Sequence, residues 1–296
     1  MLADSLQLLE DRLQLLAIEV VLSIETSKLT FPRRSSSRVL QSEGMELAIV
    51  LTMFVLGILL GFVGAGGSGF IIAILTVIFG VPIHMALGTS LAAMVFTSLS
   101  GAYSHFRQGN ISIKTGLIVG GFGAVASYLG SKLAGIIPMH SLHWLTAGML
   151  FLSAVILIVR LFIVQKIKAK DKVETNSTFL LIKKAAGVGI VTGLLSGTFG
   201  IGAAPFIQIG LLLILGLSLK QSVGTTMLVI LPIALAGGVG YYFQGYLDFT
   251  LLVEVVAGTM IGSYVGAKFT ALAPQPVLKS AMVITPIMAG AIMLIS

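Results

Sequence analysis

The sequence predicts an all-α, polytopic membrane protein built from two homologous halves, and three observations support this fold class. Apolar residues make up 56% of the chain and charged residues only 10%, whereas a soluble domain carries about 25% charged residues. Several apolar runs reach the roughly 20 residues that a helix needs to cross a bilayer. The second half also repeats the first half's spacing of glycine and polar residues. Membrane strands would read as alternating runs of about ten residues, so helices are the expected spanning element.

The chain divides into four parts. Residues 1–44 mix leucines with charged residues and form an N-terminal extension, expected to be amphipathic or disordered. Residues 45–165 form the first transmembrane repeat, residues 166–180 a basic cytoplasmic linker, and residues 181–296 the second repeat. The apolar runs lie near 46–80, 86–106, 113–136 and 141–165, and near 181–216, 222–243, 249–272 and 275–296. The first run of each repeat is too long for one simple span and is broken by glycine.

A shift of 136 residues aligns the two repeats without a gap from about Gly57 to Leu142. Glycines coincide in this register, as do the Gln-Gly pairs at 108–109 and 244–245. Ser127, Tyr128, Gly130 and Lys132 fall on Ser263, Tyr264, Gly266 and Lys268. Chance matches between apolar residues would not keep these polar positions in one register, so the halves arose by duplication.

Basic residues indicate the orientation of the chain in a cell (inner) membrane. The net charge of +7 comes largely from clusters between apolar runs, chiefly Arg160, Lys166, Lys168, Lys170, Lys172, Lys183 and Lys184. Such clusters mark cytoplasmic loops and do not resemble a nucleic-acid interface. If residues 181–216 cross the membrane once, the repeats are parallel; if they enter and return, or cross twice, the repeats are inverted. The inverted arrangement places more basic loops in the cytoplasm, and we expect it.

Several classes of function lack the residues that they need. The chain has no cysteine and four scattered histidines, so we expect no metal site, no cofactor and no enzyme activity. It also has no Gly-x-x-x-x-Gly-Lys-Ser/Thr loop, which argues against ATP hydrolysis by this chain.

The paired glycine-rich breaks are the strongest candidate site. They lie at equivalent positions in the two halves and include Gly64, Gly66 and Gly67, and Gly200, Gly202 and Ala203. A broken helix exposes backbone N–H groups that need a partner in hydrocarbon, and the following half-helix offers its positive end to an anion. Close helix packing through small residues is the alternative reading of each single glycine. Paired breaks in two repeats indicate a transporter binding site.

The chain resembles the TauE/SafE family of sulfite and organosulfonate exporters over residues 46–296. The resemblance rests on the Gly-x-x-Gly-x-Gly-Gly-x-Gly-Phe break at 61–70, the Ala86–Ser90 segment, and their repeats at 197–206 and 222–226. It implies transport of sulfite or related sulfur anions across a bacterial membrane. The chain departs from the family pattern at Ala203-Ala204, which replace a glycine pair.

Hydroxyl residues next to the breaks complete the predicted pocket. We expect Ser68, Thr89, Ser90, Thr225 and Thr226 to donate to an oxyanion. The segments 88–90 and 224–226 are expected to begin the next helix of each half, so capping is the alternative role of their hydroxyl groups. Candidates for the pathway are Gln108, Gln244, Tyr128 and Tyr264, which can instead close loops or bridge helices. Glu254 is the only acidic residue well inside an apolar run, and is either a proton carrier or a residue near the headgroups.

The sequence therefore predicts a secondary transporter, acting by alternating access, for a small sulfur-containing oxyanion held at the paired breaks. An anion channel, or a membrane assembly subunit without transport activity, is the alternative. The expected partners are the anion, the bilayer and a second copy of the chain in a homodimer, because helix surfaces rich in small residues pair readily.

Overall fold

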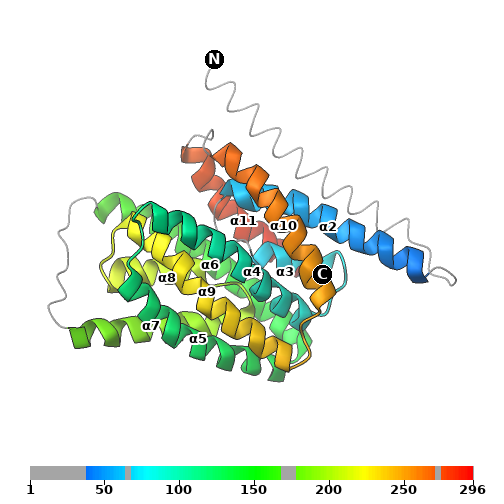
Figure 1. The fold of residues 1–296 in the computed structure, drawn as a ribbon, viewed down its shortest axis with the longest axis horizontal. Helices are drawn as coiled ribbons and strands as arrows, with labels where there is room; N and C mark the ends of the chain where they lie inside the picture. The colour runs from blue at the N-terminus through cyan, green and yellow to red at the C-terminus, as the bar shows by residue number, and fades with distance from the viewer. Residues whose placement is uncertain (1–37, 64–67, 168–177, 271–274, 296) are drawn as a thin grey trace, which may run out of the picture. The chain divides into compact units, whose positions relative to one another are not determined.

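The structure, a computed structural model, describes residues 38–63, 68–167, 178–270 and 275–295. Within these ranges the chain is helical and contains no strand, which confirms the predicted fold class (Figure 1). The helices are α2 (Arg38–Val63), α3 (Ser68–Val77), α4 (Ile83–Arg107), α5 (Ile113–Ile136), α6 (Met139–Ile167), α7 (Thr178–Phe199), α8 (Ala204–Ile209) with a π-helical continuation η1 (Gly210–Ile214), α9 (Leu219–Phe243), α10 (Phe249–Thr270) and α11 (Gln275–Ile295).

Five of these helices, α4, α5, α6, α7 and α9, are long and apolar enough to cross a membrane. Their outward faces carry large apolar side chains, among them Leu117, Val125, Leu129, Val191 and Leu235, which suits contact with lipid. The predicted amphipathic helix in residues 1–44 falls largely outside the described residues, and the fold below concerns Met45 onward.

The helices recur at the spacing of the sequence repeat. A shift of 136 residues carries α4, from Ile83 to Arg107, onto the bounds of α9. The same shift carries the end of α2 at Val63 onto the end of α7, and the start of α3 at Ser68 onto the start of α8. Each half therefore interrupts its first helix at an equivalent place.

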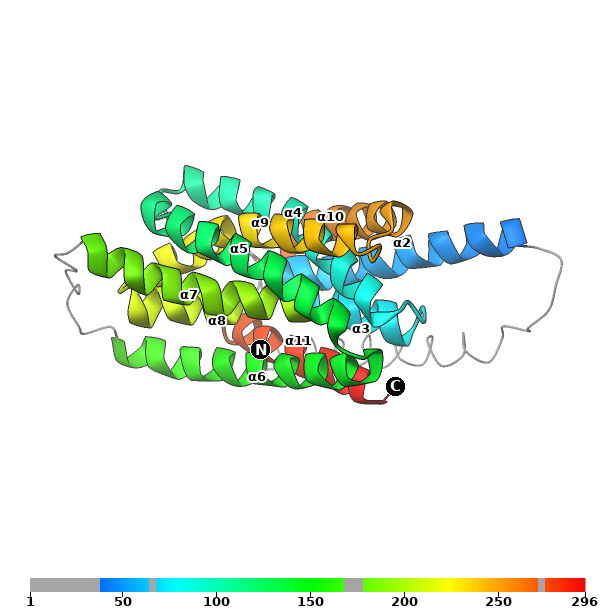
Figure 2. The ribbon, with the colours of Figure 1, turned by 90° about the horizontal axis from the view of Figure 1, so that it is seen from below.

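The two halves interlock through small residues. α5 and α7 lie side by side and run in the same direction (Figures 1 and 2), because Gly189 of α7 lies against Val119 of α5 and Gly197 lies against Ser127. A Cβ atom on Gly193 would lie 2.7 Å from the backbone carbonyl carbon of Gly123, so the two backbones are in direct contact.

Helices α2 and α10 repeat this arrangement. A Cβ atom on Gly57 would lie 2.9 Å from Cα of Thr259, and one on Gly258 would lie 2.7 Å from Cβ of Met53. The first helix of each half therefore packs on the fourth helix of the other half. The last helices of the halves, α6 and α11, also pack together (Figure 2).

Helices α4 and α9, which are equivalent in the repeat, are antiparallel neighbours. Gly88 near the start of α4 lies against Tyr241 near the end of α9, and Gly101 farther along α4 lies against Met227 nearer the start of α9. Helix α9 runs parallel to α5, since Gly116 lies against Leu228 and Gly135 against Gln244.

Helices α7 and α8 form a hairpin. A Cβ atom on Gly210 of η1 would lie 2.6 Å from the Val188 side chain of α7, on the other side of the break. Both α7 and α9 run parallel to α5, so the short segment between them must return to the end at which α7 began. The run 181–216 therefore enters and returns. Helices α2 and α3 form a similar hairpin. Helix α2 runs parallel to α10, so both begin at the same end of the bundle, and α4 also begins at that end. The short α3 between α2 and α4 must therefore lead the chain back to the end at which α2 began.

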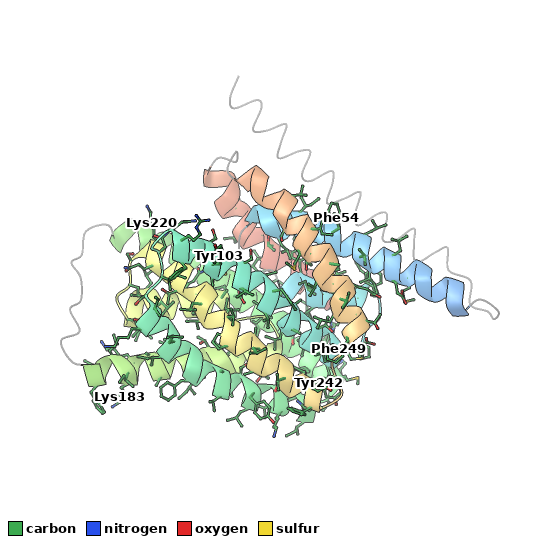
Figure 3. All side chains as sticks on the ribbon, viewed as in Figure 1. Phe54, Tyr103, Lys183, Lys220, Tyr242 and Phe249 are labelled. Atoms are coloured by element: carbon green, nitrogen blue, oxygen red, sulfur yellow. The ribbon has the colours of Figure 1, made fainter. Side chains whose placement is uncertain are left out.

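The two ends of the bundle differ in charge. We call the end where α4 stops and α5, α7 and α9 begin the basic end; it carries Arg107, Lys114, Lys183, Lys184 and Lys220. The acidic end, where α4, α2 and α10 begin, carries Glu46, Asp248 and Glu254. Figure 3 shows Lys183 and Lys220 at one end and Tyr242 and Phe249 at the opposite end. Lys132 is an exception, since it lies at the acidic end with Nζ 4.8 Å from the centroid of the Tyr128 ring.

Candidate functional site: the meeting of the two broken helices

The second break spans Gly200 to Ala203, between α7 and α8. Gly200 and Gly202 have φ angles of 65° and 66°, and Ala203 has a φ of 46°. Glycine adopts this left-handed region freely, whereas a side chain at Ala203 makes the conformation costly. Among the described residues other than glycine, only Ala203 has a positive φ. The predicted second break is present; Gly64, Gly66 and Gly67 of the first break lie outside the described residues.

Side-chain hydroxyl groups donate hydrogen bonds to the backbone carbonyl groups at the C-terminal end of α7 and in the break that follows it. The Tyr241 hydroxyl donates to the carbonyl oxygens of Gly197 at 2.9 Å and Thr198 at 3.3 Å. Ser90 Oγ donates to the carbonyl oxygen of Gly200 at 2.9 Å. These side chains come from α9 and α4, so helices of both halves hold the break in place. They also satisfy carbonyl groups that have no partner within α7.

The N-terminus of α3 lies against this break. Ser68 is the first residue of α3, and its Oγ lies 3.7 Å from the position that a Cβ atom on Gly202 would occupy. The Sδ atom of Met94 lies 2.5 Å from the same position. The structure therefore brings Ser68 from one half and Gly202 from the other together.

Ser68 offers an unused hydrogen bond at this point. Its side chain is 1% exposed, and its Oγ has no partner among the described residues. Thr89 and Ser196, which lie next to the break on α4 and α7, are also buried with unpartnered hydroxyls. Buried polar groups are normally satisfied, and the first N–H groups of α3 have no partner within their own helix. Unpartnered donors at a positive helix end suit an anion.

Thr225 and Thr226 lie away from this cluster, toward the basic end. Thr225 Oγ1 accepts a hydrogen bond from the Ser112 backbone N–H at 3.0 Å, and Thr226 Oγ1 donates to the Ser222 carbonyl oxygen at 2.7 Å. Their proposed contact with an anion stays a prediction.

The capping role considered for the hydroxyl pairs is wrong. Helix α4 begins at Ile83 after Pro82, and no side chain caps its first turn. Helix α9 is capped by Ser218, whose Oγ accepts from the N–H of Gln221 in a capping box. The Gly-Thr-Ser and Gly-Thr-Thr segments therefore lie within their helices and do not begin them.

Two further candidates, Gln108 and Gln244, are the C-caps of α4 and α9. Each precedes a glycine with a positive φ, and Gln244 Nε2 donates to the carbonyl oxygens of Ser131 and Gly240. Both residues therefore close helix ends, which was the alternative role.

The remaining candidates lie apart from the break. Tyr128 is half-buried under Lys132, and the side chain of Tyr264 lies outside the described residues. Glu254 is 9% exposed, in the second turn of α10 near the acidic end. This position agrees with either of its two predicted roles.

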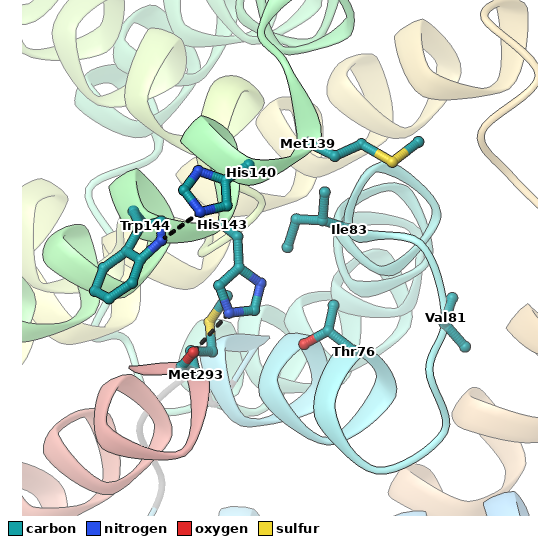
Figure 4. Close-up of a pocket in the computed structure, with 8 residues that line it drawn as sticks. All are labelled: Thr76, Val81, Ile83, Met139, His140, His143, Trp144 and Met293. Carbon is teal, nitrogen blue, oxygen red and sulfur yellow. Dashed lines mark hydrogen bonds between the residues drawn. The ribbon is translucent and has the colours of Figure 1, made fainter. Parts of the chain in front are cut away.

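A separate pocket of about 320 Å³ opens at the acidic end. It lies where α3 and the start of α4 meet α6 and α11 (Figure 4), and it is lined by Thr76, Val81, Ile83, Met139, His140, His143, Trp144 and Met293. His143 Nε2 donates to the Met293 carbonyl oxygen, and Trp144 Nε1 donates to His140 Nε2 at 3.2 Å. The pocket adjoins the returning limb of the first hairpin, α3.

Sequence reasoning missed Tyr241 and Met94. Tyr241 has His105 as its repeat equivalent, so it is not one of the polar residues that the two halves share. The sequence feature that could have identified Tyr241 is a tyrosine within an apolar helix, because a buried tyrosine hydroxyl needs a hydrogen-bond partner.

Comparison with known proteins identifies the family. The model of the family "Sulfite exporter TauE/SafE" matches residues 49–293, which include both breaks. The chain belongs to the TauE/SafE family. A relative from Bacillus subtilis, "Probable membrane transporter protein YdhB", is 60% identical over 249 residues, covering 84% of this chain and all of the relative.

More distant relatives of this TauE/SafE protein carry similar names. "Probable membrane transporter protein YjnA" of Bacillus subtilis is 26% identical and covers 78% of this chain and 93% of its own length. "Probable membrane transporter protein MJ0441" of Methanocaldococcus jannaschii is 28% identical and covers 74% of this chain and 84% of its own. No solved structure matches the chain. The protein is thus a multi-pass membrane protein of a transporter family.

Proposed function

We propose that this TauE/SafE protein is a secondary transporter that exports a small sulfur-containing oxyanion, such as sulfite or an organosulfonate. The family description names sulfite export. The observation that carries the proposal is the unpartnered, buried Ser68 hydroxyl at the start of α3, directly opposite Gly202 of the other half. A bound oxyanion would accept from this hydroxyl and from the free N–H groups of the first turn of α3.

The proposed mechanism is alternating access between inverted repeats. Equivalent helices α4 and α9 are adjacent and antiparallel, which supports a two-fold axis perpendicular to the helices and therefore in the membrane plane. The two hairpins enter from opposite ends and meet at Ser68 and Gly202. Rocking one half against the other would open this point first to one side and then to the other.

The charges support one orientation. The positive-inside rule places the basic end in the cytoplasm, so the α7–α8 hairpin enters from the cytoplasm and the α2–α3 hairpin from outside. Glu254 then lies near the outer face, where an external proton can reach it. We propose that protonation of Glu254 couples transport to the proton gradient.

Counterflow of labelled sulfite in sealed proteoliposomes tests the proposal. The wild-type protein should exchange internal sulfite for labelled external sulfite without net current. A conductive, uncoupled flux would indicate a channel, and the absence of any flux would favour an assembly subunit; either result contradicts the proposal.

Two serine variants localise the site. Removing a hydrogen bond to a charged group costs about 1.5–3 kcal/mol, so Ser68→Ala should weaken sulfite affinity roughly tenfold to a hundredfold. Ser222→Ala is the matched control, because Ser222 is also fully buried and unpartnered but lies near the start of α9 at the basic end. Equal affinities of the two variants would remove Ser68 from the site.

A further inference from the structure

The helices around the break are free of ionisable acidic and basic side chains over long stretches. Lys, Arg, Asp and Glu are absent from residues 47–106, 115–131, 185–219 and 221–247. These ranges contain the whole of both breaks, all of α3, α8 and η1, and nearly all of α4 and α9. These stretches therefore supply no cationic side chain to neutralise a substrate anion at the meeting point of the hairpins.

The titratable groups on the surrounding helices are held at the ends. On α4, His84 donates from Nε2 to the Ala134 carbonyl oxygen and stacks on Tyr246 at the acidic end. His105, near the other end of the same helix, lies beside Gly224 at the basic end.

The described titratable groups on the other packed helices follow this pattern, including Lys132 of α5 and Glu254 of α10 toward the acidic end; the side chains of Lys268 and Lys279 lie outside the described residues. His140 and His143 lie in the first turns of α6 at the acidic end, and Lys183 and Lys184 lie in the first turns of α7 at the basic end. The Tyr241 hydroxyl already donates to carbonyl oxygens of α7. The unpartnered side-chain donor that lies opposite Gly202 is therefore neutral: it is the Ser68 hydroxyl, at the N-terminus of α3 with that helix's first backbone N–H groups.

Neutral donors discriminate strongly between charge states. The cost of moving an ion out of water rises with the square of its charge, so a dianion loses about four times as much hydration as a monoanion of the same size. Hydrogen bonds from hydroxyl and N–H groups grow only in proportion to the charge that accepts them. A cationic side chain could offset the difference, and the sequence places none in these stretches.

We infer that the site selects its substrate by charge and accepts monovalent oxyanions. The class comprises sulfonates with a single negative charge and the hydrogensulfite form of sulfite, while dianions such as sulfate are rejected. This inference rests on the proposed function, since it concerns the anion held opposite Gly202.

Competition in proteoliposomes tests the inference with three probes. Labelled methanesulfonate, which stays a monoanion, should exchange at a rate that sulfate suppresses at least about tenfold less well than unlabelled methanesulfonate does. Between about pH 6 and pH 8, unlabelled sulfite should become a roughly tenfold weaker competitor as its dianion replaces hydrogensulfite. Unlabelled methanesulfonate should change by less than about twofold, which controls for titration of the protein.

The outcomes separate the two proposals. Sulfate that competes as well as methanesulfonate, or sulfite that competes better at the higher pH, would overturn charge selection while leaving transport intact. Absence of exchange with every anion would overturn both the transport function and the inference built on it.

Discussion

The substitution Gly202→Ala probes the meeting point of the hairpins with a single methyl group. At this position the added Cβ would contact Met94 and would lie 3.7 Å from Ser68 Oγ. An oxyanion oxygen needs to approach the Ser68 hydroxyl to about 2.7 Å, and the methyl group would occupy the side of Ser68 that faces the break. The variant should therefore lose substrate affinity.

The backbone cost of this substitution can be separated from its steric effect. Gly202 has a φ of 66°, and an alanine there costs about 1–2 kcal/mol because its Cβ approaches the carbonyl oxygen. Gly109→Ala is the matched control: Gly109 has a φ of 69°, and a Cβ there would meet nothing within 4 Å. Both variants bear the same backbone cost, and only Gly202→Ala intrudes on Ser68 and Met94.

The magnitude follows from the neighbours. Met94 is a flexible thioether that can move aside, so overpacking should add only about 1–3 kcal/mol to the loss of stability. Loss of the Ser68 hydrogen bond to the anion should reduce affinity roughly tenfold to a hundredfold. The assay is sulfite counterflow at several substrate concentrations, with a melting curve of each purified variant. A Gly202→Ala variant with the substrate affinity of Gly109→Ala would refute the reasoning.

Three further predictions concern helix packing, the carbonyl groups at the C-terminal end of α7, and coupling of transport to protons. Gly193→Ala should lower the melting temperature, because the added Cβ meets the backbone of Gly123, which cannot move aside. The control Gly187→Ala, on the same helix, meets nothing and should raise the melting temperature slightly, because alanine has a higher helix propensity than glycine. Tyr241→Phe should cost about 1–3 kcal/mol of stability by leaving buried carbonyls unpaired; Tyr242→Phe is the exposed control, and equal melting points would contradict the assignment. Glu254→Gln should abolish the pH dependence of proton-driven methanesulfonate transport, in which the substrate itself does not titrate, while Asp248→Asn, which keeps the cap of α10, should preserve it. An unchanged pH profile for Glu254→Gln would remove that residue from coupling.

Helix positions were predictable from the sequence because apolar length fixes where a chain crosses a bilayer. The break at Gly200 and Gly202 was predictable because glycine is favoured at positive φ. Ala203 also adopts the left-handed conformation, which an alanine in the sequence does not predict.

The course of the first run of each half was predictable only in part. Loop charge favoured a run 181–216 that returns or crosses twice over one that crosses once, and the contact between Val188 and Gly210 shows that it returns as a hairpin. The sequence of an apolar run does not show which of its helical turns contact one another, because those contacts depend on tertiary packing.

Repetition guided the choice of site residues only in part. Ser90 reaches the opposite break, while Thr226, its repeat equivalent, bonds back to Ser222. Equivalent positions meet different neighbours because the halves have diverged. Tyr241 was missed for the same reason, since the other half has His105 in its place.

Protection of a thiol at position 68 tests most directly whether the anion binds at Ser68, where the two hairpins meet. The chain has no cysteine, so Ser68→Cys and, as a control, Ser222→Cys each introduce a single thiol that a methanethiosulfonate reagent can label in active proteoliposomes. Methanesulfonate, which does not react with thiols or disulfides, should slow labelling at position 68 with the same half-saturating concentration as for its own transport, and should leave labelling at position 222 unchanged. Labelling at position 68 that stays constant while methanesulfonate saturates transport would contradict the claim.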